Sequence, residues 1–227
     1  MSDYDSPVFA AWRAQAGDDW QAYIDHPFVT GLGDGSLPRD VFLTYLIQDY
    51  LFLLHYSKAW AMAVVKGESV REMSTAATMV DVLINAETRL HVAICDREGL
   101  TEAQLGLAEE RPENLAYTRY LMDAGLCGDL LDLLAAVAPC VFGYGEIGLN
   151  LTRSHNTQSA YREWIDSYAG GEYQTLCRTV GGLIEQACAA RLGPEPEKSP
   201  RWAVLCRRFT TATRLEVAFW DMPFKSI

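Results

Sequence analysis

Residues 139–148 read PCVFGYGEIG, and their last six letters fit the pattern G-x-G-x-x-G. In dinucleotide-binding proteins this pattern follows a β-strand and opens the helix of a βαβ unit. Here the preceding residues, 130–138, read LLDLLAAVA, and Leu and Ala favour helix. The rest of the sequence shows no alternating β-branched run that would supply a partner strand. The stretch is therefore predicted to be a helix, with glycines that let another helix or a ligand approach closely.

The remaining hydrophobic periodicity is helical along the chain. Ser69 and Glu72 form a potential capping box, which predicts a helix start after Ser69. The side chains predicted to face inward on that helix are Ala76, Val80, Leu83, Ile84, Leu90 and Ile94. We expect helices at about 7–24, 39–66, 70–97, 112–126, 129–151, 159–168, 172–191 and 200–220, with loops at 26–38 and 193–197. The pattern predicts an all-α fold, a single-domain helical bundle over residues 1–227.

Composition and charge exclude several classes of protein. The net charge of -11 argues against a nucleic-acid partner, because phosphate binding uses clusters of basic residues. The first residues, MSDYDSPVFAAW, do not have the basic and apolar regions of a secretion signal. The apolar stretch 133–145 is expected to be too short to cross a membrane. Six widely spaced cysteines are typical of reduced thiols, so we expect a cytoplasmic protein without a disulfide framework or a zinc site.

Acidic residues interrupt the apolar faces of three predicted helices. Asp49, Glu87 and Glu216 each lie among apolar neighbours at helical spacing. Burying a carboxylate is unfavourable unless the group is paired, so these acids suggest a shared polar pocket. A satisfied ion pair or helix–helix hydrogen bond in the core is the simpler alternative for Asp49 and Glu216. Glu87 precedes His91 by four residues, and for these two we favour a simple pair within one helix.

Cys140 follows a proline inside the predicted helix. Pro139 removes one backbone hydrogen bond and is expected to kink the helix. Cys140, Tyr144 and Gly148 follow at steps of four and therefore share one face. Cys140 is either a small buried hydrophobic residue or a nucleophile. A nucleophilic thiol needs a nearby group to accept its proton, and the inward Asp49 is a candidate.

Motifs along nearly the full length resemble the TenA or thiaminase II family, which has a haem-oxygenase-like helical fold. The blocks that carry the resemblance, in chain order, are His26-Pro-Phe-Val29, Gly33-Asp-Gly-Ser-Leu-Pro38, Tyr45-Leu-Ile-Gln-Asp49 with Phe52, Glu87-x-x-x-His91, Tyr117, Pro139-Cys140-x-x-x-Tyr144-x-Glu146, Tyr161-x-x-Trp164-Ile165-x-x-Tyr168 and Glu216-x-x-Phe219-Trp220-x-Met222.

The resemblance implies a hydrolase that acts on thiamine or on its aminopyrimidine degradation products and releases 4-amino-5-hydroxymethyl-2-methylpyrimidine. It implies that Cys140 adds to carbon 6 of the pyrimidine, that Glu216 handles the ring proton and that Asp49 holds the amino edge of the ring. The aromatic residues implied to line the site are Phe52, Tyr117, Tyr144 and Tyr168. Phe52 stands where the family can have tyrosine, so a hydroxyl contribution is lost there. The resemblance also implies a homotetramer, and because the sequence has no cluster of histidines we expect no metal, haem or other cofactor.

Other functions of a haem-oxygenase-like fold remain as alternatives. A di-iron oxidase needs carboxylates and histidines together, whereas this chain has four histidines, His26, His55, His91 and His155. None of them lies near Glu216 in the sequence. A haem enzyme would need an inward axial histidine, and His55 lies only at the edge of an apolar face. A cofactor-less oxidase and a non-catalytic pyrimidine-binding regulatory protein complete the alternatives, and the preferred substrate stays open.

Overall fold

The computed structural model describes residues 3–153 and 159–225, and within these ranges the secondary structure is helical, with no strand. The α-helices are α1 (Pro7–Ala16), α2 (Asp18–Ile24), α3 (Pro27–Asp34), α4 (Arg39–Lys66), α5 (Val70–Val82), α6 (Thr88–Arg97), α7 (Glu102–Gly106), α8 (Pro112–Cys127), α9 (Leu130–Arg153), α10 (Arg162–Ala169), α11 (Gly171–Leu192) and α12 (Trp202–Asp221). A π-helical turn, η1 (Leu83–Glu87), joins α5 to α6, and short 3₁₀ turns follow at η2 (Pro196–Lys198) and η3 (Met222–Phe224). The predicted all-α bundle is confirmed; a single domain over all 227 residues stays a prediction.

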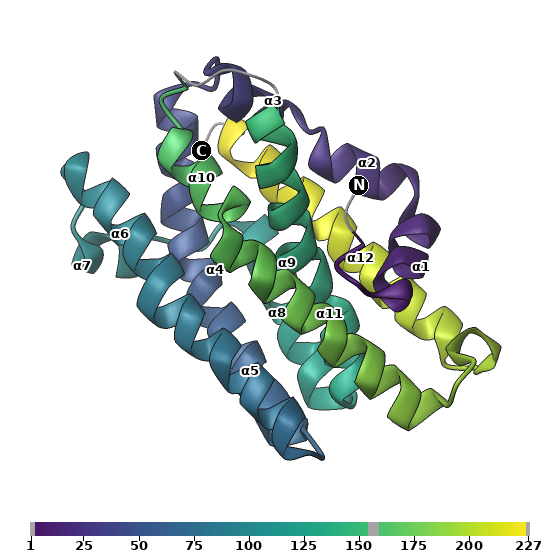
Figure 1. Cartoon of the computed structure of the whole chain (residues 1–227). Coiled ribbons are helices and arrows are strands. Elements are labelled where there is room, and N and C mark those ends of the chain that lie inside the picture. Colours follow the sequence, from purple (N-terminus) through teal and green to yellow (C-terminus); the bar gives the residue numbers. More distant parts are fainter. Residues whose placement is uncertain (1–2, 154–158, 226–227) are drawn as a thin grey trace.

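Helix α9 occupies the centre of the bundle. It packs against α12, α10, α11, α8 and α4, while α5 and α6 extend along α4 at one side of the molecule (Figure 1). The helix extends beyond the apolar stretch 133–145 on both sides, and its 24 residues are, by length and composition, enough to cross a membrane. However, 94% of the most apolar window of α9 is buried inside the protein, as expected for a core helix.

The glycines of the 139–148 stretch allow close packing within this core, as predicted. A Cβ atom on Gly148 would lie 2.6 Å from the backbone nitrogen of Ala169 in α10. A Cβ atom on Gly143 would lie 2.0 Å from the ring of Tyr23 in α2. Since the stretch lies inside a helix and no strand precedes it in the described residues, the dinucleotide-loop interpretation is excluded.

The N-terminal region differs from the prediction in two places. The helix expected over 7–24 is broken at Gly17. This residue has a φ of 51° and lies between the end of α1 and the start of α2. The loop expected over 26–38 contains α3, because His26 caps its first turn and Pro27 occupies its first position. Gly31 and Gly33 lie inside α3 despite their low helix propensity, and Gly35, with a φ of 82°, ends the helix as its C-cap.

The segment 70–97 is helical throughout, but the π turn η1 changes which of its side chains face the core. A π turn inserts one extra residue and rotates the following side chains about the helix axis. Ile84, predicted to face inward, is 50% exposed, whereas Leu83 and Ile94 are buried. At the start of α5 the Ser69 hydroxyl accepts from Glu72 N–H as predicted. The Glu72 carboxylate instead accepts from the backbone of Glu68 and pairs with Arg191 of α11, so the capping box is only half formed.

Candidate active site

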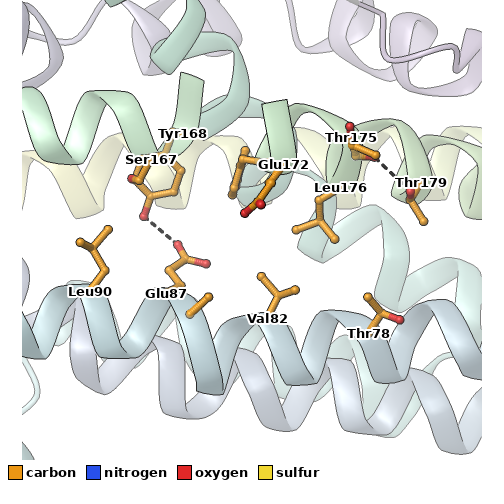
Figure 2. Close-up of a pocket in the computed structure, with 12 residues that line it drawn as sticks. Thr78, Val82, Glu87, Leu90, Ser167, Tyr168, Glu172, Thr175, Leu176 and Thr179 are labelled. Atoms are coloured by element: carbon orange, nitrogen blue, oxygen red, sulfur yellow. Dashed lines mark hydrogen bonds between the residues drawn. The ribbon is translucent and has the colours of Figure 1, made fainter. Parts of the chain in front are cut away.

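A chain of buried polar groups connects α4, α6 and α10. His91 is fully buried, and its Nδ1 lies 2.8 Å from Oδ2 of Asp49. Its Nε2 lies 3.4 Å from the hydroxyl of Tyr168, which donates a 2.7 Å hydrogen bond to Glu87 (Figure 2). The predicted pairing of Glu87 with His91 was therefore wrong, because each finds its partner on another helix. The π turn η1 ends at Glu87 and rotates the side chains that follow it about the helix axis.

Electrostatics favour a charged imidazole at the centre of this chain. Burial alone would lower the pKa of His91, but the adjacent Asp49 carboxylate and the charge of Glu87 raise it overall. Burial raises the pKa of Glu87, although His91 and the hydrogen bond from Tyr168 oppose the change. The second oxygen of the Asp49 side chain does not contact His91, so it can accept a hydrogen bond from a ligand.

Tyr45 joins this chain to α9. Its hydroxyl donates to Asp49 over 3.3 Å and lies 3.4 Å from the hydroxyl of Tyr144. Trp164 of α10 donates its indole N–H to the hydroxyl oxygen of Tyr45 at 3.2 Å. Sequence reasoning did not assign a role to Tyr45, although it precedes Asp49 by four residues and so lies on the same helix face.

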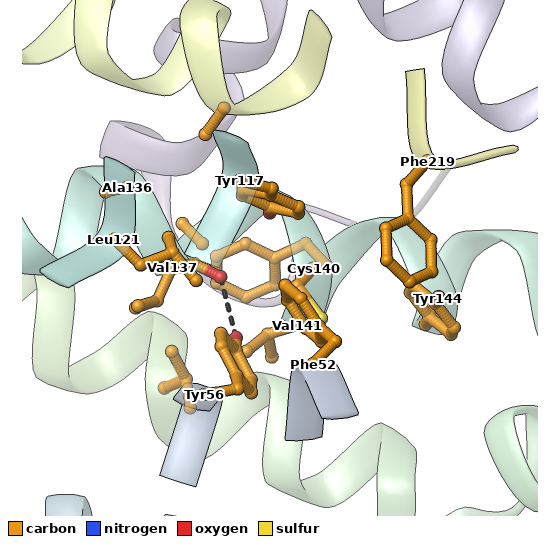
Figure 3. Packing of buried hydrophobic residues seen from close by; sticks show 14 of the residues in the cluster. Phe52, Tyr56, Tyr117, Leu121, Ala136, Val137, Cys140, Val141, Tyr144 and Phe219 are labelled. Carbon is orange, nitrogen blue, oxygen red and sulfur yellow. Dashed lines mark hydrogen bonds between the residues drawn. The ribbon is translucent and has the colours of Figure 1, made fainter. Parts of the chain in front are cut away.

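Cys140 of α9 follows Pro139 and lies in a buried cluster of aromatic side chains, which we call the aromatic chamber. Its side chain lies beside Phe52 of α4 and Tyr117 of α8, with Phe219 of α12 nearby (Figure 3). The rings of Phe52 and Tyr117 are 5.0 Å apart between centroids. One turn of α9 towards the N-terminus, the carbonyl of Val137 accepts a 2.8 Å hydrogen bond from Tyr56. The flat aromatic walls suit a planar heterocycle.

Glu216 is buried beside this chamber, and no Lys, Arg or His among the described residues forms an ion pair with it. It is 1% exposed, and its Oε1 accepts a 2.8 Å hydrogen bond from the Tyr117 hydroxyl. Burial raises its pKa to about 8; the hydrogen bond from Tyr117 opposes the rise, and the charge of Asp49 adds to it. At neutral pH Glu216 is therefore mainly protonated and can donate a proton. This is the property that a general acid requires.

The thiol of Cys140 is neutral at rest. Burial raises its pKa well above the ordinary value, and the charges of Glu216, Glu87 and Asp49 add to the effect. It is 6% exposed, more than the buried acids around it. Since the thiolate is the nucleophile, its proton has to leave as the sulfur attacks.

The predicted site residues converge on one region, and their roles stay predictions. Tyr144 and Tyr168 contact each other with ring centroids 4.8 Å apart, and the Tyr144 side chain lies one turn of α9 beyond Cys140. The residues so brought together from α4, α8, α9, α10 and α12 are Asp49, Phe52, Tyr117, Cys140, Tyr144, Tyr168 and Glu216. The additional polar contacts come from Tyr45, Tyr56, His91 and Trp164. The tertiary partner of His91 could not be read from the sequence.

The other histidines and the cysteines have structural roles or lie elsewhere. His26 caps α3 and contacts Asp221, and His55 lies near Arg119 and Glu110. His155 is outside the described residues. Among the described residues, no group of three His, Cys, Asp or Glu side chains is arranged to hold a metal ion. All six cysteines are described and are free thiols, as expected.

Comparisons with known proteins show which proteins this chain resembles. The chain is 36% identical to an aminopyrimidine aminohydrolase of Halalkalibacterium halodurans over 90% of both chains. A crystal structure described as a TenA family transcription regulator, from Silicibacter sp. TM1040, is similar over the whole of both chains, with 50% identity and a TM-score of 0.96. A haem oxygenase-like domain of unknown function from Shewanella denitrificans covers 95% of this chain, and this chain covers 91% of it. At 12% identity and a TM-score of 0.72 it shows the shared fold.

Most of the chain also matches a single family model. The match to TENA/THI-4/PQQC runs over residues 13–225, which include every helix of the candidate site. The chain belongs to the TENA/THI-4/PQQC family.

Proposed function

We propose that this protein is an aminopyrimidine aminohydrolase of the thiaminase II type. It hydrolyses thiamine or aminopyrimidine degradation products of thiamine and releases 4-amino-5-hydroxymethyl-2-methylpyrimidine. The observation that carries the proposal is the burial of a thiol, Cys140, and a protonated carboxyl, Glu216, in one aromatic chamber. The name of the Halalkalibacterium relative supports the same reaction.

Binding uses the shape and the polar edge of the chamber. The pyrimidine ring lies against Phe52 and Tyr117, which provide flat apolar contact. Asp49, positioned by its contact with His91, accepts a hydrogen bond from the amino group of the ring. Glu216 faces the ring nitrogen next to carbon 6.

The chemical step is a covalent substitution at the methylene group on carbon 5. The sulfur of Cys140 bonds to carbon 6 and its proton passes to a base, for which Asp49 is the candidate, while Glu216 protonates the adjacent ring nitrogen. The bond from the methylene to the leaving group then breaks. Its electron pair departs with the leaving group, and an exocyclic double bond forms. Water adds to the methylene and gives up one proton, to the leaving group or, where that group is a neutral thiazole, to solvent. The ring nitrogen returns its proton to Glu216, and the sulfur leaves and takes back the proton that Asp49 accepted. The sum is R–CH₂–X plus water giving R–CH₂–OH plus HX; a thiazolium group leaves as neutral thiazole and a proton.

A substrate panel tests the proposal directly. Purified protein is incubated with thiamine and with 4-amino-5-aminomethyl-2-methylpyrimidine, and the hydroxymethyl product is quantified by chromatography. We expect turnover of at least one substrate, and the ratio of their kcat/KM values identifies the preferred one. Failure to form the hydroxymethyl product from either substrate would overturn the proposal.

Chelation separates this hydrolase from a metal-dependent oxidase. The proposed step uses a thiol and carboxyl groups, so full turnover is expected after dialysis against a chelator. Stoichiometric bound iron together with activity restored by iron alone would contradict the hydrolase.

The Silicibacter structure is described as a transcription regulator, which makes a regulatory role the alternative of another class. Because this chain carries a net charge of -11, we expect no DNA binding in a gel-shift assay at moderate salt. Specific DNA binding in the absence of turnover would favour regulation.

Assembly and location complete the proposal. We propose a homotetramer, on the family resemblance, and a cytoplasmic location, which agrees with six free cysteines. Light scattering on the purified protein and fractionation of cells test the two statements separately.

A further inference from the structure

A cavity of about 450 Å³ lies beside the candidate site, between α5, η1 and α6 on one side and α10 and α11 on the other. Figure 2 shows Glu87, Val82 and Leu90 reaching into it from one side and Glu172 and Leu176 from the other. The chamber around Cys140 lies deeper in the bundle. This cavity has no role in the reaction steps proposed above.

Two tyrosines separate the cavity from the catalytic thiol. Tyr168 lines the cavity, and its ring contacts Tyr144 on the other side with centroids 4.8 Å apart. Tyr173 also lines it and donates a 3.2 Å hydrogen bond to the carbonyl of Val141, the residue after Cys140. The two rings contact each other with centroids 4.9 Å apart. The wall between the cavity and the region of the thiol is therefore one layer of side chains thick.

The charged side chains that line the cavity are acidic. Glu87 and Glu172 contribute carboxylates, and the described residues that line it include no Lys, Arg or His. Glu87 is fixed by the hydrogen bond from Tyr168, whereas Glu172 is exposed and its carboxylate points into the cavity (Figure 2). Carboxylates that line a cleft raise the local concentration of cations and repel anions.

We infer that this cavity receives the leaving half of the substrate, and that Glu87 and Glu172 favour leaving groups with a positive charge, such as a thiazolium or an alkylammonium. The inference rests on the proposed hydrolase. A pyrimidine held beside Cys140 has to direct the substituent of its methylene group out of the aromatic chamber, and the rings of Tyr168 and Tyr173 lie between that chamber and this cavity.

Two substrates with the same aminopyrimidine and different leaving groups test the charge preference. One carries a thiazolium and the other a neutral thioether of similar size, so intrinsic reactivity cancels when a variant is compared with the parent on each substrate. We expect Glu172→Gln to lower kcat/KM by ~3- to 10-fold for the cation only, the scale of a partly exposed ion pair. Added salt should reduce the difference. Glu197→Gln, an exposed acid before α12, makes the same charge change elsewhere and should leave both substrates unaffected.

A cavity-filling substitution tests the location independently of charge. Leu176→Trp should lower kcat/KM for the large thiazolium substrate by about tenfold or more and leave the aminomethyl substrate, which releases ammonia, within about twofold, because bulk in the cavity obstructs only the larger group. Equal losses on the two substrates, or no loss on either, would overturn the inference while leaving the hydrolase intact. A parent protein that turns over none of the substrates overturns the hydrolase itself.

Discussion

Glu146 and Glu216 are both buried in this bundle, and they have opposite surroundings. Glu146 of α9 lies 3.4 Å from the guanidinium of Arg13 and accepts a 3.2 Å hydrogen bond from the indole of Trp20. Glu216 of α12 has the neutral hydroxyl of Tyr117 as its hydrogen-bond partner. Burial raises the pKa of both carboxyls, but Arg13 opposes the rise at Glu146, whereas the charge of Asp49 adds to it at Glu216.

The difference separates an acid that supports the fold from one that can exchange a proton. At Glu146 the charge is compensated, and the carboxylate ties α1 and α2 to the central helix. At Glu216 the compensation is missing, so the protonated form persists to about pH 8. An uncompensated acid is retained at a cost in stability, and such perturbed groups concentrate at functional sites.

The largest effect is expected from Cys140→Ser, which removes the nucleophile beside Glu216. The change replaces one atom in a well-packed helix, so the fold should survive. A serine hydroxyl is far less acidic than a thiol, and the described site contains no free imidazole base next to Cys140, since His91 is engaged with Asp49. Product formation should fall by ~10³-fold or more, while calorimetry shows near-parent affinity for the hydroxymethylpyrimidine product.

Circular dichroism provides the control for Cys140→Ser, and Cys177→Ser is the matched substitution. Cys177 is a buried thiol on α11 that donates to the carbonyl of Val141 and has no place in the proposed reaction. Its variant should keep near-parent turnover. A folded Cys140→Ser protein that hydrolyses at the parent rate would make Cys140 a core residue.

The next largest effect is expected at Asp49. Asp49→Asn keeps the size of the side chain but removes the charge that faces His91 and the amino group of the substrate. We expect kcat/KM to fall by ~10²-fold or more, the scale for a misplaced acid–base group. Unchanged kinetics would leave Asp49 with a structural role, as the partner of a buried histidine.

A third prediction concerns how stability changes with pH at Glu216. Its pKa rises from 4.5 to about 8 on folding, so between these values the folded protein holds a proton that the unfolded chain has lost. Stability therefore falls as pH rises through this window, by about 1.4 kcal/mol per pH unit for one such group. Glu216→Gln should remove this slope. Urea denaturation of the parent and the variant between pH 5.5 and 7.5 measures it, and parallel curves would show that Glu216 has an ordinary pKa.

The sequence allowed the helices and the inward acids to be predicted, but not their partners. Asp49 and Glu216 were identified because each interrupts an apolar face, and this signal is local. His91 was paired with Glu87 because spacing within one helix can be read from sequence, whereas its contact with Asp49 depends on how α4 packs against α6. The exposure of Ile84 depends on a π turn, which hydrophobic periodicity does not reveal.

The smallest effect is expected at Glu146. Because Arg13 compensates its charge, neutralising this acid should hardly change the rate of the reaction. Glu146→Gln keeps an oxygen that can accept from Trp20, and Arg13 also contacts Asp3, so its charge is not left alone. We expect a loss of about 1 kcal/mol in stability, the scale of one hydrogen bond, and a kcat/KM within about twofold of the parent. The same urea series should show no loss of the pH dependence that Glu216→Gln removes. A loss of turnover in folded Glu146→Gln as large as that in Asp49→Asn would break the distinction, because compensation by an arginine would then not mark an acid as structural.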